Sequence, residues 1–159
     1  MEAFEGQNWG NVKKFEIALR SAVNFPENQK VVYSDEISFN NGGNFTEIPF
    51  ILESAFFTDQ EENSDAGLFW SKKAGIKIPK LRSEVGLFLQ PFEGVRLVAR
   101  ITDMNGEIHL VYPLRMQRQR NIQGPVASLN HTLVEFSGQA ISESPVVMDT
   151  DQSGSPLFN

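Results

Sequence analysis

The sequence predicts a mainly β fold, an antiparallel β-sandwich or barrel of about seven strands with one short α-helix. Apolar and polar side chains alternate along Phe15–Arg20 and again along Leu68–Ile78, which is the period-two pattern of half-buried strands. Asn105 and Gly106 form a dipeptide that favours tight hairpin turns. Apolar residues recur at helical spacing in a single stretch, after Pro79, so strands dominate the prediction.

The first third of the chain is predicted to form three strands. Alternation places the first strand over Val12–Val23, and the β-branched and aromatic residues of Val31–Phe39 favour a second. Asn40–Asn44 is predicted to be a hairpin turn, because its glycine and asparagine residues tolerate positive φ. Glu47–Phe57 has the apolar density of a buried strand, and Pro49 restricts its start to a sheet edge or a bulge.

The middle of the chain is predicted to be a loop, a strand and a helix. Thr58–Gly67 is polar and acidic, which indicates a loop, and Leu68–Ile78 is a strand whose apolar face is interrupted by Lys72. A helix of roughly three turns is expected after Pro79, and Gly94 follows its end.

The remaining strands lie between turn signals. Val95–Thr102 alternates as a strand, and Asp103–Gly106 is the clearest turn of the chain. Ile108–Met116 is the returning strand, interrupted at Pro113. His131–Ala140 is predicted to close the domain as a last strand.

Length and composition favour one domain without covalent cross-links. Residues 1–141 of the 159 are expected to form a single β-rich domain, and residues 142–159 an acidic C-terminal tail. The absence of cysteine excludes disulfides and thiolate metal sites. Residues 1–10 contain two glutamates and no apolar run, so they are not expected to be a secretory signal. No stretch approaches the roughly 20 apolar residues that cross a bilayer, so no membrane partner is predicted.

Charge is distributed unevenly along the chain, whose net charge is −6. Residues 1–70 hold 4 basic and 12 acidic groups, residues 71–120 hold 10 and 4, and residues 121–159 hold no basic and 4 acidic groups. This distribution disfavours a general nucleic-acid binder, which normally carries a dominant basic stripe. Two interpretations stay open: an ordinary soluble surface, and a self-complementary surface on which acidic and basic faces of successive copies meet.

The basic residues of the central region are the candidate subunit interface. They are Lys72, Lys73, Arg96, Arg100, Arg115, Arg118 and Arg120. The alternatives are exposed strand faces whose charges discourage edge-to-edge aggregation, and a groove for single-stranded nucleic acid, which would need more interleaved aromatic residues.

Catalytic, metal-binding and cofactor sites are not predicted. His109 and His131 each lie in an expected strand, and no nucleophile elbow, zinc-protease helix or phosphate-binding loop is present. Four carboxylates crowd Asp59–Asp65, which is more simply a solvated acidic loop than a glycosidase pair or a calcium site. The chain is therefore predicted not to be an enzyme and to need no cofactor.

Several segments resemble a known group of proteins. Ser64–Trp70 leads into Gly75–Pro79 and the helix, Phe92–Val98 leads into the turn Asp103–Gly106, and Val134–Gly138 follows. This order is similar to small proteins encoded in the tail regions of phages and prophages, and the strand-rich body with one helix resembles the tail-tube fold.

The resemblance implies a structural virion protein of a phage tail or neck, a tube, tube-capping or connector subunit that forms a ring. Its implied partners are further copies of itself and other tail or neck proteins, with DNA only passing through an acidic lumen. Tube proteins usually carry a long inserted hairpin, for which Val31–Phe57 is the candidate. A monomeric β-sandwich that acts as a binding or adaptor module is the alternative, and a hydrolase working through carboxylates is a third class.

Overall fold

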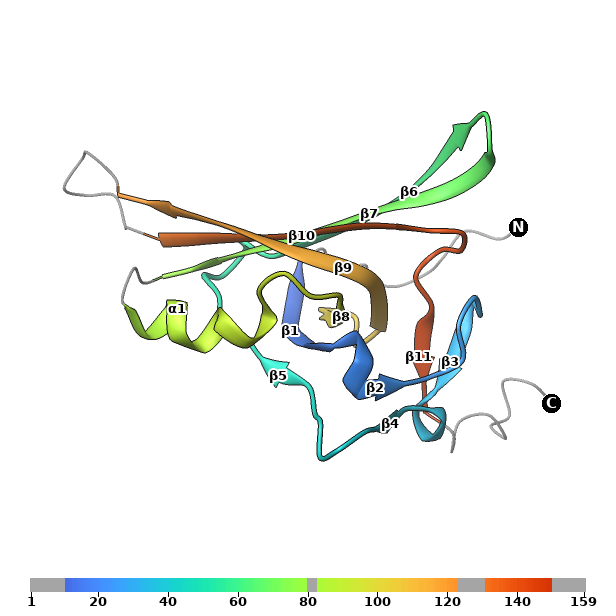
Figure 1. The fold of residues 1–159 in the computed structure, drawn as a ribbon, viewed down its shortest axis with the longest axis horizontal. Helices are drawn as coiled ribbons and strands as arrows, with labels where there is room; N and C mark the ends of the chain where they lie inside the picture. Colours follow the sequence, from blue (N-terminus) through green and yellow to red (C-terminus); the bar gives the residue numbers. More distant parts are fainter. Residues whose placement is uncertain (1–10, 80–82, 123–130, 150–159) are drawn as a thin grey trace.

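The structure is a computed structural model that describes residues 11–79, 83–122 and 131–149. These residues form one α-helix, α1 (Ser83–Leu89), and eleven strands (Figure 1). The strands are β1 (Val12–Leu19), β2 (Val23–Asn24), β3 (Val31–Tyr33), β4 (Ser38–Phe39), β5 (Thr46–Glu47), β6 (Phe56–Ser64), β7 (Gly67–Ile78), β8 (Leu97–Asp103), β9 (Ile108–Asn121), β10 (His131–Ala140) and β11 (Val146–Met148). Three 3₁₀ turns accompany them: η1 (Arg20–Ala22), η2 (Ser34–Glu36) and η3 (Gln90–Phe92). The predicted mainly β fold with one short helix is confirmed.

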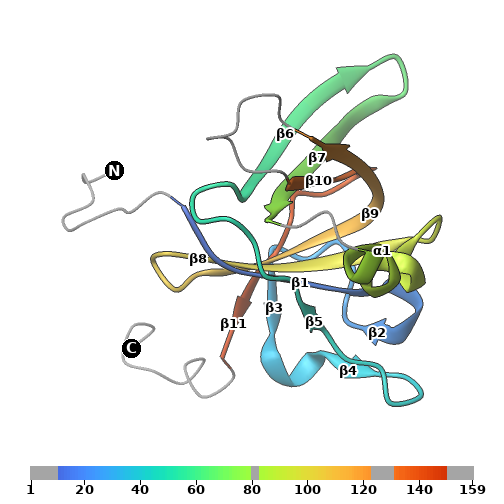
Figure 2. The same ribbon diagram turned by 90° about the vertical axis from the view of Figure 1, so that its left-hand side faces the viewer.

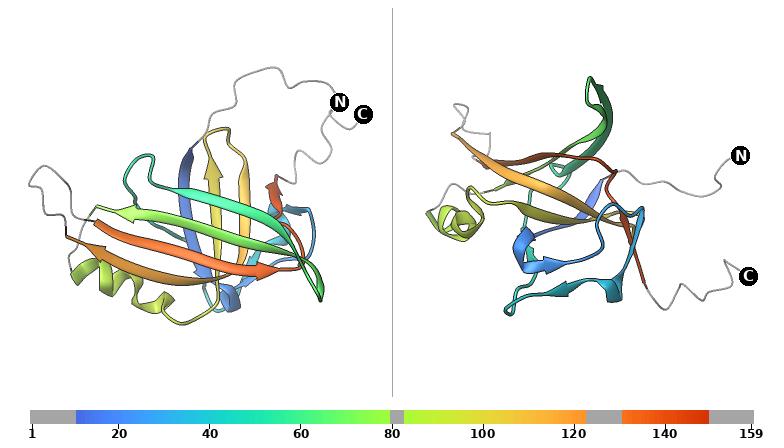
Figure 3. Two further views of the ribbon diagram at one scale, coloured as in Figure 1. Left: turned by 90° about the horizontal axis from the view of Figure 1, so that it is seen from above. Right: turned by 45° about the vertical axis from the view of Figure 1, so that its right-hand side comes forward.

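Two sheets share the long strand β9. In the first sheet the order is β5–β1–β8–β9, and β11 and β3 extend it on the far side of β9. In the second sheet the later half of β9 pairs with β10, followed by β7 and β6. The strands of the two sheets run crosswise, as the left view of Figure 3 shows. Both sheets end in strands with a single partner, β5 and β6, so the fold is an open sandwich and not a closed barrel.

The main core lies between the two sheets. Phe15 of β1 and Phe136 of β10 are both fully buried, and their ring centroids are 5.5 Å apart across the sandwich. The alternating residues Leu97, Ala99 and Ile101 of β8 point into the same core, as the sequence predicted. Burying a side chain of this size contributes roughly 1.5–3 kcal/mol, so these alternating positions hold the sheets together.

A second core covers the opposite face of the first sheet. Val98, Leu110 and Tyr112 point into it from β8 and β9, and Val32 of β3 and Phe25 close it from the other side. The first sheet is therefore buried on both faces. In Figure 2 the short strands β2, β3 and β4 lie below β1 and β8, where they cover this second core.

The chain passes from one sheet to the other at Pro113. Residues 108–111 of β9 and, after a register shift, Leu114 pair with β8, and residues 115–121 pair with β10. Proline has no N–H to donate to a ladder, which suits a position between two sets of strand partners. At the crossing, a Cβ atom on Gly138 of β10 would lie 1.8 Å from the carbonyl oxygen of Pro113. The sheets approach so closely there that only glycine fits.

The strand predictions for residues 31–57 were wrong in most of their length. Val31–Phe39 is divided into β3, η2 and β4, and Glu47–Phe57 is mainly irregular between β5 and β6. The turn Asn40–Asn44 does not join paired strands, because β4 pairs with β2 and β5 pairs with β1. The apolar residues of this segment close the cores from outside, for example Ile48, which is 1% exposed. Val31–Phe57 is therefore not the long inserted hairpin.

The predicted acidic loop Thr58–Gly67 is instead mostly strand. β6 pairs with β7 over nine residue pairs from Phe56–Gly75 to Ser64–Gly67, and this hairpin projects beyond the body (Figure 1). β10 pairs with β7 only as far as Trp70, so the end of the hairpin has solvent on both faces. A two-sided polar strand lacks the apolar alternation on which the prediction relied.

The helix packs against the main core, and the C-terminal strand β11 pairs with the first sheet. α1 continues through η3, and Leu89 and Phe92 are buried in the main core. The prediction of a tail from residue 142 was wrong for Ser144, which is buried, and for Val146–Met148, which pairs with β3 and β9. Residues 150–159 lie outside the described residues. Among the residues that the structure describes, no helix is long and apolar enough to span a membrane.

We predict that Gly138→Ala lowers the free energy of unfolding by about 1–3 kcal/mol or more, because the new methyl group collides with the Pro113 carbonyl. Urea unfolding followed by tryptophan fluorescence measures the change. The control is Gly86→Ala in α1, where a Cβ would meet its nearest atom at 3.9 Å, an ordinary contact. Alanine is the better helix former, so this control should gain up to about 1 kcal/mol. Equal stability of the two variants would contradict the tight crossing.

Candidate functional site

The seven basic residues predicted as a subunit interface occupy separate places. Lys72 is buried, and Arg100 is half-buried against a carboxylate. Lys73 is exposed on the outer face of β7, and Arg96 is exposed beside a pocket at the start of β8. The other three, Arg115, Arg118 and Arg120, are exposed on the later half of β9. A single interface made of all seven is therefore excluded.

Lys72 points into the protein and not toward a partner. It shares the inner face of β7 with the buried Ala74 and Ile76, and only 1% of its surface is exposed. Its Nζ atom has no hydrogen-bond partner among the described residues and lies 5.0 Å from the centroid of the Tyr112 ring. Burial lowers the pKa of Lys72, although the Asp59 and Glu143 carboxylates oppose that shift. Its assignment to an interface was wrong because a polar residue on an apolar strand face was taken as exposed.

The carboxylate beside Lys72 is already engaged by the C-terminal segment. Asp59 is the cross-strand neighbour of Lys72, and it accepts hydrogen bonds from the backbone N–H of Ser144 at 2.6 Å and from its hydroxyl at 3.1 Å. The segment that leads into β11 is thus fastened to the base of the β6–β7 hairpin. Lys72 lies beneath this attachment as a cation that nothing neutralises directly.

Arg100 has a structural partner on the neighbouring strand. Its Nε and Nη2 donate to the two carboxylate oxygens of Glu16 at 3.0 and 2.7 Å, and its guanidinium lies 4.2 Å from the Phe45 ring centroid. Glu16 is 6% exposed, so this bidentate pair satisfies a buried carboxylate. Arg100 is therefore committed within the protein and is not available to a second subunit.

The arginines of β9 lie along its later half, from Arg115 in the middle of the second sheet to Arg120 near its end. Thr132 pairs with both Arg120 and Ile78, which places Arg120 at the end of the sheet opposite the β6–β7 turn. Arg118 forms an ion pair with Glu93, and Arg115 donates to the carbonyl of Gly94 at 3.4 Å. All three side chains are exposed, and this end of the sheet is basic.

An apolar pocket lies at the same end. It has a volume of about 480 Å³. Its walls come from α1, from the end of β7 and from β5 with the segment after it. They include the apolar residues Ile48, Ile78, Val85 and Phe88, and two carboxylates, Glu47 and Glu84, also line it. The basic end of the second sheet therefore also offers an apolar hollow.

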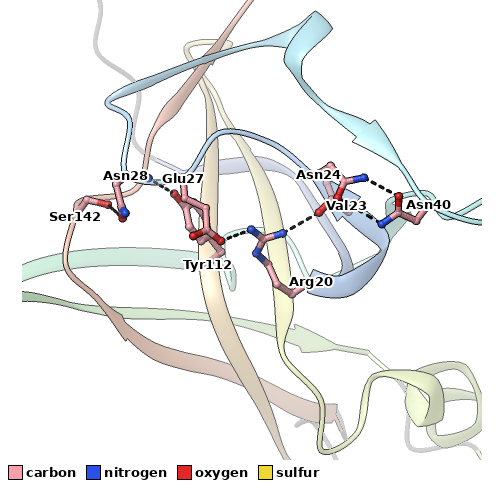
Figure 4. A network of polar contacts seen from close by, with 8 residues as sticks. All are labelled: Arg20, Val23, Asn24, Glu27, Asn28, Asn40, Tyr112 and Ser142. Atoms are coloured by element: carbon pink, nitrogen blue, oxygen red, sulfur yellow. Dashed lines mark hydrogen bonds and ion pairs between the residues drawn. The ribbon is translucent and has the colours of Figure 1, made fainter.

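A larger polar pocket opens between β1, β2, β9 and β10. Its volume is about 570 Å³, and Figure 4 shows the polar contacts beside it. Arg20 donates to the carbonyl of Val23 at 2.8 Å and forms an ion pair with Glu27. The hydroxyl of Tyr112 accepts the backbone N–H of Asn28 at 3.1 Å, and the Arg20 guanidinium is 5.6 Å from the Tyr112 ring centroid.

A cluster at the β8–β9 turn has the donor atoms of a metal site. Ligand atoms of Asp103, Glu107 and His109 all lie within 4.8 Å of one another, and His109 Nε2 is 3.3 Å from Asp103 Oδ2. The other Asp103 oxygen accepts the backbone N–H groups of Asn105 and Glu107. These hydrogen bonds and the contact between Asp103 and His109 explain why the three side chains lie together in the turn, without a bound metal. His109 lies in a strand, as expected, with its ring centroid 5.6 Å from that of Phe57.

Sequence reasoning did not find the polar pocket. Its lining residues come from four regions of the chain, Arg20–Asn28, Arg96, Tyr112–Pro113 and Gln139–Ile141. No local motif connects them. One signal was present: Arg20 and Arg96 lie within the two predicted strands Val12–Val23 and Val95–Thr102, and strand pairing can bring such positions together.

The chain matches no protein-family model, no curated protein and no solved structure. The resemblance to phage tail-region proteins therefore stands on the sequence segments alone.

We predict that Arg100→Ala lowers the free energy of unfolding by about 1.5–3 kcal/mol, because it leaves the buried Glu16 carboxylate without its charged donors. Thermal and urea unfolding at neutral pH measure this loss. The control, Arg96→Ala on the same strand face, removes an exposed cation and should change stability by less than about 0.5 kcal/mol. Equal effects of the two substitutions would rule out the proposed difference between the arginines.

We predict that Lys72→Met raises stability at pH 7 by an amount of order 1 kcal/mol, because it removes an unpartnered buried cation. In the folded protein the pKa of Lys72 is below its ordinary value of 10.5. At a pH between the folded and the unfolded pKa, the unfolded chain therefore binds more protons than the folded protein. The stability of the natural protein should therefore rise with pH across that window. Urea unfolding between pH 6 and about 10 measures the slope, and a slope that persists unchanged in Lys72→Met would assign it to other groups.

Proposed function

We propose that this protein is a non-enzymatic structural subunit of a phage tail or neck, and that it acts by assembling head to tail into a ring. The observation that carries the proposal is the polarity of the second sheet. One end is a projecting acidic hairpin, and the other end is basic and hollowed. A surface pair of this kind, placed at opposite ends of one rigid sheet, supports contacts that close into rings or continue as filaments.

The acidic end is the tip of the β6–β7 hairpin, residues 61–69. Glu61 and Asp65 are exposed there, and no basic residue occurs within the tip. Leu68 is 60% exposed in this tip. β6 also has a free edge, because β7 is its one strand partner among the described residues. The tip therefore combines negative charge, an apolar side chain and unpaired backbone groups.

The basic end carries Arg115, Arg118 and Arg120 together with the apolar pocket beside α1. In the proposed contact, the carboxylates of one tip face the arginines of the next copy, and Leu68 is covered by the apolar pocket. Complementary charges set the orientation and speed of such contacts, and apolar burial supplies most of the affinity.

The proposed partners are further copies of this chain and other virion tail or neck proteins, with DNA passing through the lumen of the assembled ring. The corresponding location is the virion. The sequence resemblance supports this context, and the sheet polarity supports the mode of assembly.

A charge-reversal experiment tests the head-to-tail contact. Glu61→Lys/Asp65→Lys alters the acidic end, and Arg115→Glu/Arg120→Glu alters the basic end. Each double variant places like charges together, so we expect each to weaken association at least tenfold in sedimentation velocity at low salt. Combining all four substitutions restores opposite charges and should recover association.

The control is Lys13→Gln/Lys30→Gln, which removes two exposed cations elsewhere and should leave association unchanged. Far-ultraviolet circular dichroism verifies that each variant is folded. A natural protein that stays monomeric at high concentration and low salt would count against self-assembly. Failure of the fourfold variant to recover association would reject the pairing of these two ends.

A further inference from the structure

The polar pocket is lined by two arginines, Arg20 just after β1 and Arg96 just before β8, at the adjacent ends of these paired strands. The β1–β8 ladder pairs Ala18 with Val98 and Leu19 with Leu97, and its next bond runs from the Arg20 N–H to the Arg96 carbonyl at 2.9 Å. Arg20 and Arg96 are therefore directly opposite residues on one face of the sheet. Both line the pocket. Like charges at opposite positions destabilise a strand pair unless an anion lies between them.

Another arginine on the same face of the β1–β8 ladder has a carboxylate opposite it. Four residues along, Arg100 is opposite Glu16, which binds it through two hydrogen bonds. Glu16 and Arg100 carry opposite charges, whereas Arg20 and Arg96 carry like charges that repel each other. The difference is a local property of the pocket.

Glu27 is the one acidic residue among those that line the pocket with Arg20 and Arg96. Glu27 forms an ion pair with Arg20, and Glu27 is itself 57% exposed in its side chain. The Arg96 side chain is exposed and makes no hydrogen bond or ion pair with the residues that the structure describes. The pocket thus holds two positive charges and one negative charge, and Arg96 is the cation without a partner.

The walls define the class of ligand. Ile141, which is 74% exposed, offers apolar surface, and the amide residues Asn24 and Gln139 also line the pocket. The volume of about 570 Å³ is within the range of roughly 300–1,000 Å³ that small-ligand pockets occupy. We propose that this pocket binds a carboxylate carried on a short carbon body, with Arg96 as its main cationic partner and Arg20 as the second. Glu27 then acts as an internal competitor for Arg20.

Isothermal titration calorimetry at constant ionic strength tests the proposal with matched probes. Benzoate and glutarate are the small acids, and benzamide and glutaramide are their neutral analogues. A peptide with the sequence of residues 58–69 and blocked ends is the polypeptide probe, and its neutral analogue has Asp and Glu replaced by Asn and Gln. We expect an acid to bind and its neutral analogue not to bind, since guanidinium–carboxylate pairs depend on charge.

Two substitutions should move the affinity in opposite directions. Arg96→Gln should weaken binding at least tenfold, and Glu27→Gln should strengthen it several-fold by releasing Arg20 from its internal partner. Lys13→Gln and Glu53→Gln, which remove exposed charges away from the pocket, should leave the affinity unchanged. Thermal unfolding verifies that the variants are folded, and the Arg96 side chain is exposed.

The arm that binds identifies the source of the carboxylate. Binding of benzoate or glutarate assigns the pocket to a small organic acid, independently of self-assembly. Binding of the acidic peptide alone assigns the pocket to an acidic polypeptide, an outcome that is separate from the proposed contact at the β9 arginines, which the charge-reversal variants test. The proposal is overturned when no probe binds, when neutral analogues bind equally well, or when Arg96→Gln binds as tightly as the natural protein.

Discussion

The crossing of β9 from one sheet to the other is the constraint on which the rest of the structure depends. Both sheets are built on this strand, and the main core lies between its two halves. The crossing requires a backbone contact between Pro113 and Gly138 that leaves no room for a side chain. Since the main core, the polar pocket and the projecting hairpin all depend on the relative position of the sheets, one glycine without a side chain sets the geometry of each.

The two sheets differ in how they use their surfaces. The first sheet is covered on both faces, and its charged residues near the second core are satisfied or gathered around the polar pocket. The second sheet leaves its outer face open and extends beyond the body at the β6–β7 end. This difference places exposed charged side chains such as Lys73 and Arg120 on the second sheet and a paired one, Arg100, on the first. It also explains why the central basic residues, which look like one group in the sequence, have unrelated roles.

Sequence reasoning succeeded where a strand has one buried face and clear turn signals. The bounds of β10 were predicted without error, and those of β7 within one residue, because apolar side chains alternate along both strands. Residues 31–57 failed because their apolar side chains cover the cores from irregular backbone, which periodicity does not distinguish from a strand. The burial of Lys72 and the pairing of Arg20 with Arg96 depend on strand register between distant segments. Local patterns carry no information on such register.

The parallel pairing of β3 with β11 has a consequence for synthesis of the protein. Val31–Tyr33 has no other strand partner among the described residues than Val146–Met148, which follows it by more than 100 residues in the sequence. Ladders between segments so far apart in sequence close slowly, because a long loop must be ordered first. On the ribosome, β3 and the outer edge of β9 therefore stay unpaired until β11 has emerged. During that interval the nascent chain displays open strand edges, the feature of partly folded proteins that chaperones most need to shield.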